Sequence, residues 1–290
     1  MPFQQPGDTG SWLRRSPANE RDGGAEPVLR LVCFPHAGGG ASSFNGWRQL
    51  VPETVELLRV QLPGREDNYS RPPFERTGEM VPELVPHLEP LFDRPVAFYG
   101  HSLGAIAAFE AIRELRRRGR PLPEVLFVSG RRAPQLPLSH PPYALAPEEQ
   151  LLDYLRAMGA TPEKVLSNPR WREHLFPTLR ADLKVSDLFS YTPGEPLPCP
   201  IYFFAGADDH FLKRHEWEGW AAQTTAEFHL RVLRGGHFFD RDEQAIIAGE
   251  ILEFLDRRLG RNILPLPAPG TSSAATAAAT MAASPPLSAE

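Results

Sequence analysis

Short apolar runs alternate with longer amphipathic segments along most of the chain. Strand-like runs, each ended by Gly, Pro or polar residues, occupy 28–34, 55–60, 95–99, 124–129, 201–205 and 229–233. Patterns with helical periodicity lie at 77–92, 106–118 and 241–259. Strands that alternate with helices pack as a parallel sheet with helices on its faces. The pattern therefore predicts an α/β fold with a mostly parallel sheet and helices on both faces.

One long interval interrupts this alternation. Between the strand-like runs at 124–129 and 201–205, residues 134–195 contain helical patterns only, at 148–158, 162–166 and 171–189. In open α/β sheets ligands bind outside the carboxyl ends of the strands, and a long insertion after a strand often covers that site. We therefore predict a helical lid, with a structural excursion unrelated to the site as the alternative.

The two ends of the chain differ in composition from its middle. Residues 1–27 are rich in Gly, Pro and charge, with one apolar pair at Trp12-Leu13, and predict a flexible arm that pins Trp12 to the surface. Residues 263–290 are rich in Pro, Ala, Ser and Thr, which cannot bury a core, and predict a disordered tail. A single globular domain is expected at 28–262.

Composition and charge exclude several classes of function. The 290 residues are 41% hydrophobic, enough for one large core, and the net charge of −5 gives no reason to expect nucleic acid as a partner. No apolar run approaches the ~20 residues of a membrane-spanning helix, and the first ten residues show no signal peptide. Cys33 and Cys199 lie in strand-like apolar surroundings, so we expect buried thiols in a reducing cytoplasm and no metal site.

The strongest chemical signal is the run Gly100-His101-Ser102-Leu103-Gly104 between a strand-like run and an Ala-rich helical segment. Gly-x-Ser-x-Gly at such a junction is the nucleophile-elbow pattern, in which the glycines permit a sharp turn that exposes the serine hydroxyl. The motif also arises by chance, so its weight depends on partners elsewhere. A serine hydroxyl is a poor nucleophile near pH 7 and needs a base, usually a histidine oriented by a carboxylate.

Candidates for both partners follow later strands in the order serine, acid, histidine, as this pattern requires. Asp208 and Asp209 follow the fifth predicted strand, and His237 follows the sixth through a Gly-Gly turn. We predict His237 as the base. Either aspartate could orient it, but the position three residues past Gly206 favours Asp209, which leaves Asp208 as a solvent-facing or capping carboxylate. His101 is expected to pack beside the nucleophile.

Hydrolysis also needs two N–H groups directed at the developing oxyanion. Leu103, at the start of the helix after the nucleophile, offers one. The Gly-rich loop 35–40 offers the second, and because Pro35 has no N–H we predict Ala37. A phosphate cradle is the alternative for this loop, but neither the lysine of a P-loop nor a Gly-x-Gly-x-x-Gly pattern is present.

Several further stretches make the chain resemble the type II thioesterases that accompany modular polyketide and non-ribosomal peptide synthases. Besides the serine motif they are Phe34-Pro35-His36-Ala37-Gly38-Gly39, Gln61-Leu62-Pro63-Gly64-Arg65, Ser129-Gly130-Arg131-Arg132-Ala133-Pro134, Arg180-Ala181-Asp182 and Gly235-Gly236-His237-Phe238. These stretches span about residues 28–260. Two of them, Ser129-Gly130-Arg131-Arg132-Ala133-Pro134 and the Pro35-His36-Ala37-Gly38-Gly39 loop, are more specific than the serine motif and separate this family from lipases and epoxide hydrolases.

The resemblance implies an α/β-hydrolase fold with Ser102 as nucleophile, His237 as base and Asp209 as acid, and no cofactor. It implies as substrate an acyl group on the phosphopantetheine arm of a carrier protein, so that acyl- or peptidyl-carrier protein domains are the implied partners. Hydrolysis through an acyl-enzyme would then remove stalled or aberrant acyl chains in antibiotic biosynthesis. One departure is His210, where many relatives carry a proline after the acid.

Three other functions remain open on the residues alone. They are a chain-terminating thioesterase domain of a larger synthase, a carboxylesterase acting on small soluble esters, and a non-catalytic scaffold. The start at Met1, without an upstream carrier domain, favours a free-standing protein over the first. The presence of all three triad residues disfavours the scaffold.

A basic surface for an acidic carrier protein is a separate hypothesis. The candidate arginines are Arg113, Arg116, Arg117, Arg118, Arg131 and Arg132. The alternative is that these arginines only end a helix or lie on a solvated face.

Overall fold

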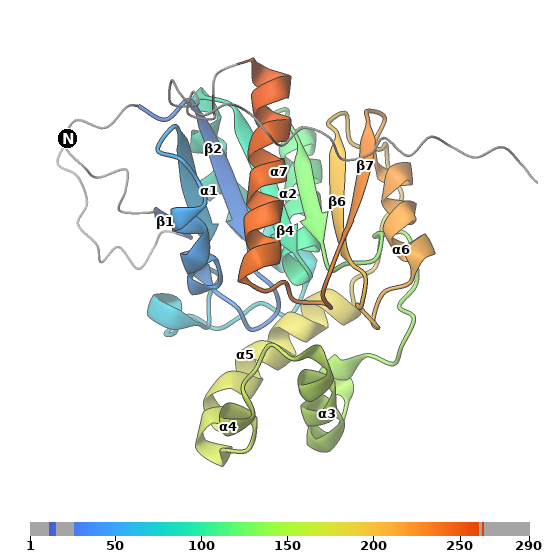
Figure 1. The fold of residues 1–290 in the computed structure, drawn as a ribbon. Helices are drawn as coiled ribbons and strands as arrows, with labels where there is room; N and C mark the ends of the chain where they lie inside the picture. The colour runs from blue at the N-terminus through green and yellow to red at the C-terminus, as the bar shows by residue number, and fades with distance from the viewer. Residues whose placement is uncertain (1–11, 16–25, 261–262, 264–290) are drawn as a thin grey trace, which may run out of the picture.

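The computed structural model describes residues 12–15, 26–260 and 263. One seven-stranded sheet runs through the molecule in the order β1-β3-β2-β4-β5-β6-β7 (Figure 1). The strands are β1 (Leu13–Arg15), β2 (Leu29–Phe34), β3 (Val55–Val60), β4 (Val96–His101), β5 (Leu126–Ser129), β6 (Ile201–Gly206) and β7 (Phe228–Leu233). Every neighbouring pair is parallel except β1 with β3. The predicted α/β class with a mostly parallel sheet is confirmed.

Helices cover both faces of this sheet (Figure 1). The α-helices are α1 (Thr77–Leu88), α2 (Leu103–Arg117), α3 (Glu148–Met158), α4 (Glu163–Leu166), α5 (Pro169–Asp187), α6 (Arg214–Glu218) and α7 (Arg241–Leu259). Short 3-10 helices are η2 (Ala41–Gln49), η3 (Glu66–Asn68), η4 (Glu89–Asp93), η5 (Tyr143–Leu145) and η6 (Gly219–Gln223). One buried apolar cluster joins α1 and α2 to the sheet, and a second joins α7 to its other face. Strands β2 to β5 are buried along their whole length, as parallel strands between two helical layers should be.

The amino-terminal segment differs from the flexible arm predicted for residues 1–27. Trp12 is fully buried against Phe74 and His87, and β1 pairs antiparallel with β3. Burial of one large aromatic ring and a short ladder of hydrogen bonds hold residues 12–15 against the sheet. Residues 1–11 and 16–25 of the predicted arm lie outside the described residues.

The predicted tail begins with one residue that the structure describes. Ile263 is fully buried, and its carbonyl oxygen accepts a hydrogen bond of 2.6 Å from Thr54 Oγ1. The packed region therefore reaches one residue beyond the predicted domain end at 262. Residues 264–290 lie outside the described part of the chain.

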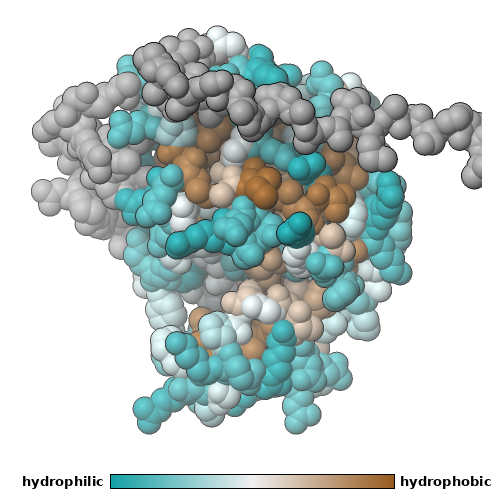
Figure 2. All heavy atoms as spheres, viewed as in Figure 1, coloured by the Kyte–Doolittle hydropathy of each residue, from teal (hydrophilic) through white to brown (hydrophobic). Residues whose placement is uncertain are grey.

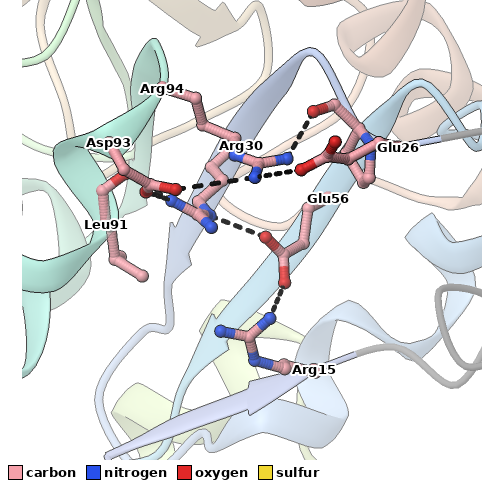
Figure 3. A network of polar contacts seen from close by, with 8 residues as sticks. Arg15, Glu26, Arg30, Glu56, Leu91, Asp93 and Arg94 are labelled. Carbon is pink, nitrogen blue, oxygen red and sulfur yellow. Dashed lines mark hydrogen bonds and ion pairs between the residues drawn. The ribbon is translucent and has the colours of Figure 1, made fainter.

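A network of charged side chains joins strands at the amino end of the sheet (Figure 3). Glu56 on β3 is 2% exposed; it accepts from Arg15 on β1 and, at 2.6 Å, from Arg30 Nε on β2. Arg30 also donates to the Leu91 carbonyl at 2.6 Å and pairs with Asp93. The network connects β1, β2, β3 and η4 on the side of the sheet away from the serine turn.

The helical insertion (residues 134–195) lies between β5 and β6 and contains η5, α3, α4 and α5, which form a separate layer beyond the carboxyl ends of the strands (Figure 1). It has an apolar cluster of its own, and the outward surface of its helices is mainly hydrophilic (Figure 2). The three predicted helices are present; α5 begins at Pro169, where the Asn168 side chain caps the Arg170 N–H at 3.0 Å. Across the described ranges no helix is long and apolar enough to span a bilayer.

Candidate active site

Ser102 occupies a sharp turn between β4 and α2. Its backbone angles, φ 54° and ψ −114°, lie in a region that side-chain-bearing residues rarely adopt. A Cβ on Gly100 would lie 2.3 Å from the Gly104 carbonyl oxygen, and a Cβ on Gly104 would lie 2.0 Å from the Phe34 carbonyl oxygen. Only glycine fits both positions, so the two motif glycines serve close backbone packing around the strained serine.

His237 and Asp209 meet next to this turn, although 27 residues separate them in the chain. His237 Nδ1 lies 2.9 Å from Asp209 Oδ2, and their side chains are only 5% and 2% exposed. Asp209 Oδ1 accepts a further hydrogen bond of 3.0 Å from the Phe211 N–H. This second bond restrains the carboxylate that contacts the imidazole.

The other ring nitrogen, His237 Nε2, is buried and has no hydrogen-bond partner within the described residues. His237 and Ser102 line the same cavity. Asp208 is exposed instead, and its N–H donates to the Gly235 carbonyl at 2.9 Å, tying the aspartate loop to the histidine loop. The structure thus brings together Ser102, His237 and Asp209, and leaves Asp208 at the surface.

Both predicted oxyanion amides belong to segments that meet at the elbow. Leu103 is the first residue of α2, where a backbone N–H has no partner within the helix. Ala37 lines the cavity that Ser102 lines. Its neighbours are engaged, since the Gly38 N–H donates to Asp182 Oδ2 at 2.7 Å and the Gly39 N–H to the His36 carbonyl at 3.0 Å. Among the described residues the Ala37 N–H has no such acceptor.

A buried ion pair holds this loop in place. Arg65 Nη1 and Nη2 lie 2.5 and 2.8 Å from the two carboxylate oxygens of Asp182, which belongs to α5. Arg65 also donates to the Gly39 carbonyl at 3.0 Å, while Asp182 accepts from Gly38. Both residues stand in stretches that carry the family resemblance, but their pairing was not predicted. Their wide separation in sequence gave no local signal that they pair.

Three histidine rings lie in contact with one another near the serine turn. His101 lies between His36 and His237, with ring centroids 5.9 and 5.3 Å away, and its Nδ1 lies 2.8 Å from Ser129 Oγ. Burial, with the neighbouring rings, lowers the pKa of His36 to about 4 and the pKa of His101 well below its ordinary value. Both rings are therefore neutral at pH 7, and neither opposes a positive charge on His237.

The glycine in the Ser129-Gly130-Arg131-Arg132 stretch has a steric role. Its φ of +61° is in the left-handed region, and a Cβ there would lie 2.7 Å from His101 Cε1 and 3.2 Å from His237 Cε1. Any side chain at this position would press on both rings. The glycine thus sets how closely β5 approaches the histidines.

The cavity at Ser102 has a volume of about 170 Å³ and lies between the sheet and the helical insertion. Apolar side chains from the insertion and from the loop after β6 line much of it: Leu155, Met158, Leu175, Leu179, Leu183, Phe211 and Leu212. A mostly apolar cavity with a few polar groups is typical of a small-molecule site. This one suits a small apolar group.

The predicted basic docking surface is wrong for Arg131 and Arg132, because both are buried and line this cavity. Arg131 donates to Ser186 Oγ at 2.7 Å and to the Ser186 carbonyl at 2.6 Å, and burial lowers its pKa to about 9. Arg113 and Arg116 donate to carbonyls of the segment 192–196. The last two predicted arginines, Arg117 and Arg118, both pair with Glu114.

Comparison with known proteins shows the family of the chain. The model of the thioesterase domain family matches residues 29–259. The chain is 38% identical over 237 residues to the gramicidin S biosynthesis protein GrsT of Aneurinibacillus migulanus, covering 82% of this chain and 91% of that protein. It is 36% identical over 250 residues to thioesterase PikA5 of Streptomyces venezuelae, covering 86% of each. The solved type II thioesterase BorB from the borrelidin biosynthetic cluster superposes with a TM-score of 0.75 at 33% identity, covering 87% of this chain and 100% of that one.

Proposed function

Because the chain belongs to the thioesterase family and is a type II thioesterase like its polyketide and non-ribosomal peptide relatives, we propose that Ser102, His237 and Asp209 hydrolyse acyl thioesters on the phosphopantetheine arm of carrier proteins. The observation that carries this proposal is the 2.9 Å contact between His237 Nδ1 and Asp209 Oδ2. The opposite ring nitrogen, Nε2, has no partner among the described residues, and His237 lines the same cavity as Ser102, whose backbone is strained. Such an arrangement leaves Nε2 available for the serine proton.

The first half of the reaction transfers the acyl group to the enzyme. Ser102 Oγ attacks the thioester carbonyl carbon while His237 Nε2 takes the hydroxyl proton, and the Asp209 carboxylate stabilises the imidazolium that forms. The Ala37 and Leu103 N–H groups bind the oxyanion. Collapse of the intermediate breaks the carbon–sulfur bond, and the proton on His237 passes to the departing thiolate of the arm.

The second half releases the acid. A water molecule attacks the ester carbonyl of acyl-Ser102 while His237 accepts one of its protons. The same two amides bind the second oxyanion, and collapse returns the proton from His237 to Ser102 Oγ. All proton transfers use groups of the chain, so the proposed reaction needs no cofactor.

Carrier protein domains are the proposed partners, since the phosphopantetheine arm presents the thioester. The helical insertion covers the cavity and would act as the lid through which the arm enters. Cys33 and Cys199 are buried free thiols, which suits a reducing cytoplasm, and we place the reaction there.

The test is Ser102→Ala, compared with Ser139→Ala, which changes another serine of the same cavity. The substrate is a carrier protein loaded with a short acyl group, and release is followed by intact-protein mass spectrometry. We expect Ser102→Ala to lose at least about 10⁴-fold in kcat and to lose labelling by a fluorophosphonate, with Ser139→Ala close to wild type. Turnover retained by Ser102→Ala would refute the proposed nucleophile. Faster hydrolysis of a chromogenic ester than of the loaded carrier would favour a carboxylesterase.

A further inference from the structure

The cavity at Ser102 has a polar end whose groups the proposed mechanism does not use. Arg132 is 5% exposed; its Nε donates to the Leu136 carbonyl at 3.1 Å. Its terminal nitrogens, Nη1 and Nη2, have no hydrogen bond or ion pair to any part of the chain that the structure describes. Unlike Arg131 Nε, they are not sealed from the cavity. A buried guanidinium therefore presents free donors to the cavity.

Asp187, the last residue of α5, lines the same polar end and is 9% exposed. Its Oδ2 accepts a hydrogen bond of 3.1 Å from the Ala144 N–H, while Oδ1 has no donor among the described residues. Burial raises the pKa of Asp187, and the hydrogen bond from Ala144 and the nearby Arg131, His140 and Arg132 oppose that rise. Arg132 and Asp187 thus attract each other without contact, because the structure holds neither an ion pair nor a hydrogen bond between them.

A gap with a donor on one side and an acceptor on the other selects its occupant. A hydroxyl or a secondary amide can accept from Arg132 and donate to Asp187 at once. A carboxylate would accept from Arg132 but would be repelled by Asp187, and an ammonium would meet the reverse conflict. A methylene would leave both charged groups desolvated and unpaired, which is costly.

The polar end belongs to the cavity that Ser102 and His237 also line. Gly130 packs on the His237 ring, and Arg132 follows two residues later, so their Cα atoms are at most ~7.6 Å apart. A substrate group bound at this end therefore belongs to the same thioester whose carbonyl Ser102 attacks, either on the acyl chain or on the arm.

We propose that Arg132 and Asp187 form a polar subsite that binds a hydroxyl or amide group of the thioester substrate. The subsite rests on the proposed function, because its ligand is part of the substrate that Ser102 attacks. Its two sources are a hydroxyl on the acyl chain and the amide of the arm next to the thioester sulfur.

Two pairs of substrates distinguish these sources. The first pair is carrier protein loaded with 3-hydroxybutyryl or butyryl. The second is the butyryl thioester of N-acetylcysteamine or of an alkanethiol of equal length. Hydrogen bonds to charged groups are among the stronger ones, so we expect wild type to favour the polar member of one pair about tenfold in kcat/KM.

The variants are Arg132→Met, which removes the donors, and Asp187→Asn. In Asp187→Asn the side-chain oxygen can keep the bond to the Ala144 N–H, and the amide NH₂ then replaces the free acceptor by a donor. Each should bring the preference close to one. Loss in the first substrate pair assigns the subsite to the acyl chain, and loss in the second assigns it to the arm. If Arg132→Met does not fold, Arg132→Lys is the substitute variant. It keeps the positive charge but offers a single ammonium in place of two terminal donor groups, so it should retain part of the preference for the polar substrate.

Arg180→Gln is the matched control. Arg180 donates to the carbonyls of Ala144 and Ala146 at 3.2 and 2.9 Å and does not line the cavity, so its loss loosens the segment that Asp187 also holds. This variant should keep the wild-type ratio. A wild-type ratio of one in both pairs, or ratios that survive both cavity substitutions, would overturn the subsite. Failure of wild type to release butyrate from the carrier would instead refute the proposed function.

Discussion

Two buried arginine–carboxylate pairs lie at opposite ends of the sheet, and they do different things. Arg30 and Glu56 join neighbouring strands at the amino end (Figure 3). At the carboxyl end, Arg65, which follows β3, pairs with Asp182 of the helical insertion and also donates to the Gly39 carbonyl in the loop after β2. Both pairs are almost completely buried and hydrogen-bonded. The Arg30–Glu56 pair stabilises the fold only. The Arg65–Asp182 pair also holds the backbone of the loop in which Ala37 lines the cavity.

Burial alone does not reveal this difference. A buried ion pair adds little stability over a well-packed apolar pair. Removal of one partner, however, leaves the other charge buried without a partner and lowers the free energy of unfolding by about 3 to 5 kcal/mol. Loss of either pair should therefore destabilise the protein to a similar degree. Only the pair that touches the oxyanion loop should change the rate of catalysis beyond its effect on folding.

The largest effect is expected at a third buried carboxylate, Asp209, which touches the proposed base itself. Asp209→Asn removes the charge that stabilises the imidazolium and allows the wrong tautomer, so kcat should fall about 10⁴-fold with little change in unfolding temperature. Asp208→Asn, at the exposed neighbour, is the control and should match wild type. Equal losses in the two variants would contradict the assignment of the acid.

The next effect is expected at Asp182. Asp182→Asn leaves Arg65 as an uncompensated buried charge and frees the loop at Gly38 and Gly39, so kcat should fall about 100-fold. Single-turnover acylation under conditions where the variant is fully folded measures this directly. Lys184 is on the same helix as Asp182 and pairs at the surface with Glu75, so Lys184→Gln is the control and should have no effect. A folded Asp182→Asn with wild-type acylation would show that the pair acts only on stability.

Glu56→Gln tests the opposite end of the sheet. It leaves Arg15 and Arg30 with one carboxylate fewer, and we expect a loss of about 3 kcal/mol in the free energy of unfolding. The value of kcat should stay at the wild-type level, because no residue of the network lines the Ser102 cavity. Urea unfolding and steady-state kinetics on the same sample separate the two quantities, and a reduced kcat in folded protein would contradict this prediction.

The last prediction concerns the pH dependence of stability. In the folded protein the pKa of His36 is lowered to about 4, below its ordinary value of about 6.5, so between these values the unfolded chain binds the proton more tightly. The contribution of the neutral ring is full above about pH 6.5 and is lost as pH falls toward 4, by at most about 1.4 kcal/mol per pH unit. The unfolding temperature should drop over this window, and less steeply in His36→Gln. The exposed His174 is the control, since His174→Gln should keep the wild-type slope.

Much of the fold follows from local patterns. Continuous apolar runs place strands β2 to β7 and periodic segments place the main helices, because both patterns reflect burial between layers. Strand β1 escaped prediction, since its three residues include two arginines and only pairing with β3 makes them a strand. The five-residue α6 and the short 3-10 helices also lack a clear periodic pattern.

The sequence by itself determined the elbow, because the steric need for glycine at 100 and 104 is local, and it placed Ser102, His237 and an aspartate at the ends of the correct strands. Only the tertiary structure decided that Asp209 and not Asp208 meets the imidazole, since the two are adjacent and differ in where the folded loop directs each side chain. It also decided that Arg65 pairs with Asp182 and that Arg132 faces the cavity. A charged residue shows its type in the sequence, but its burial and its partner depend on segments brought together from far along the chain.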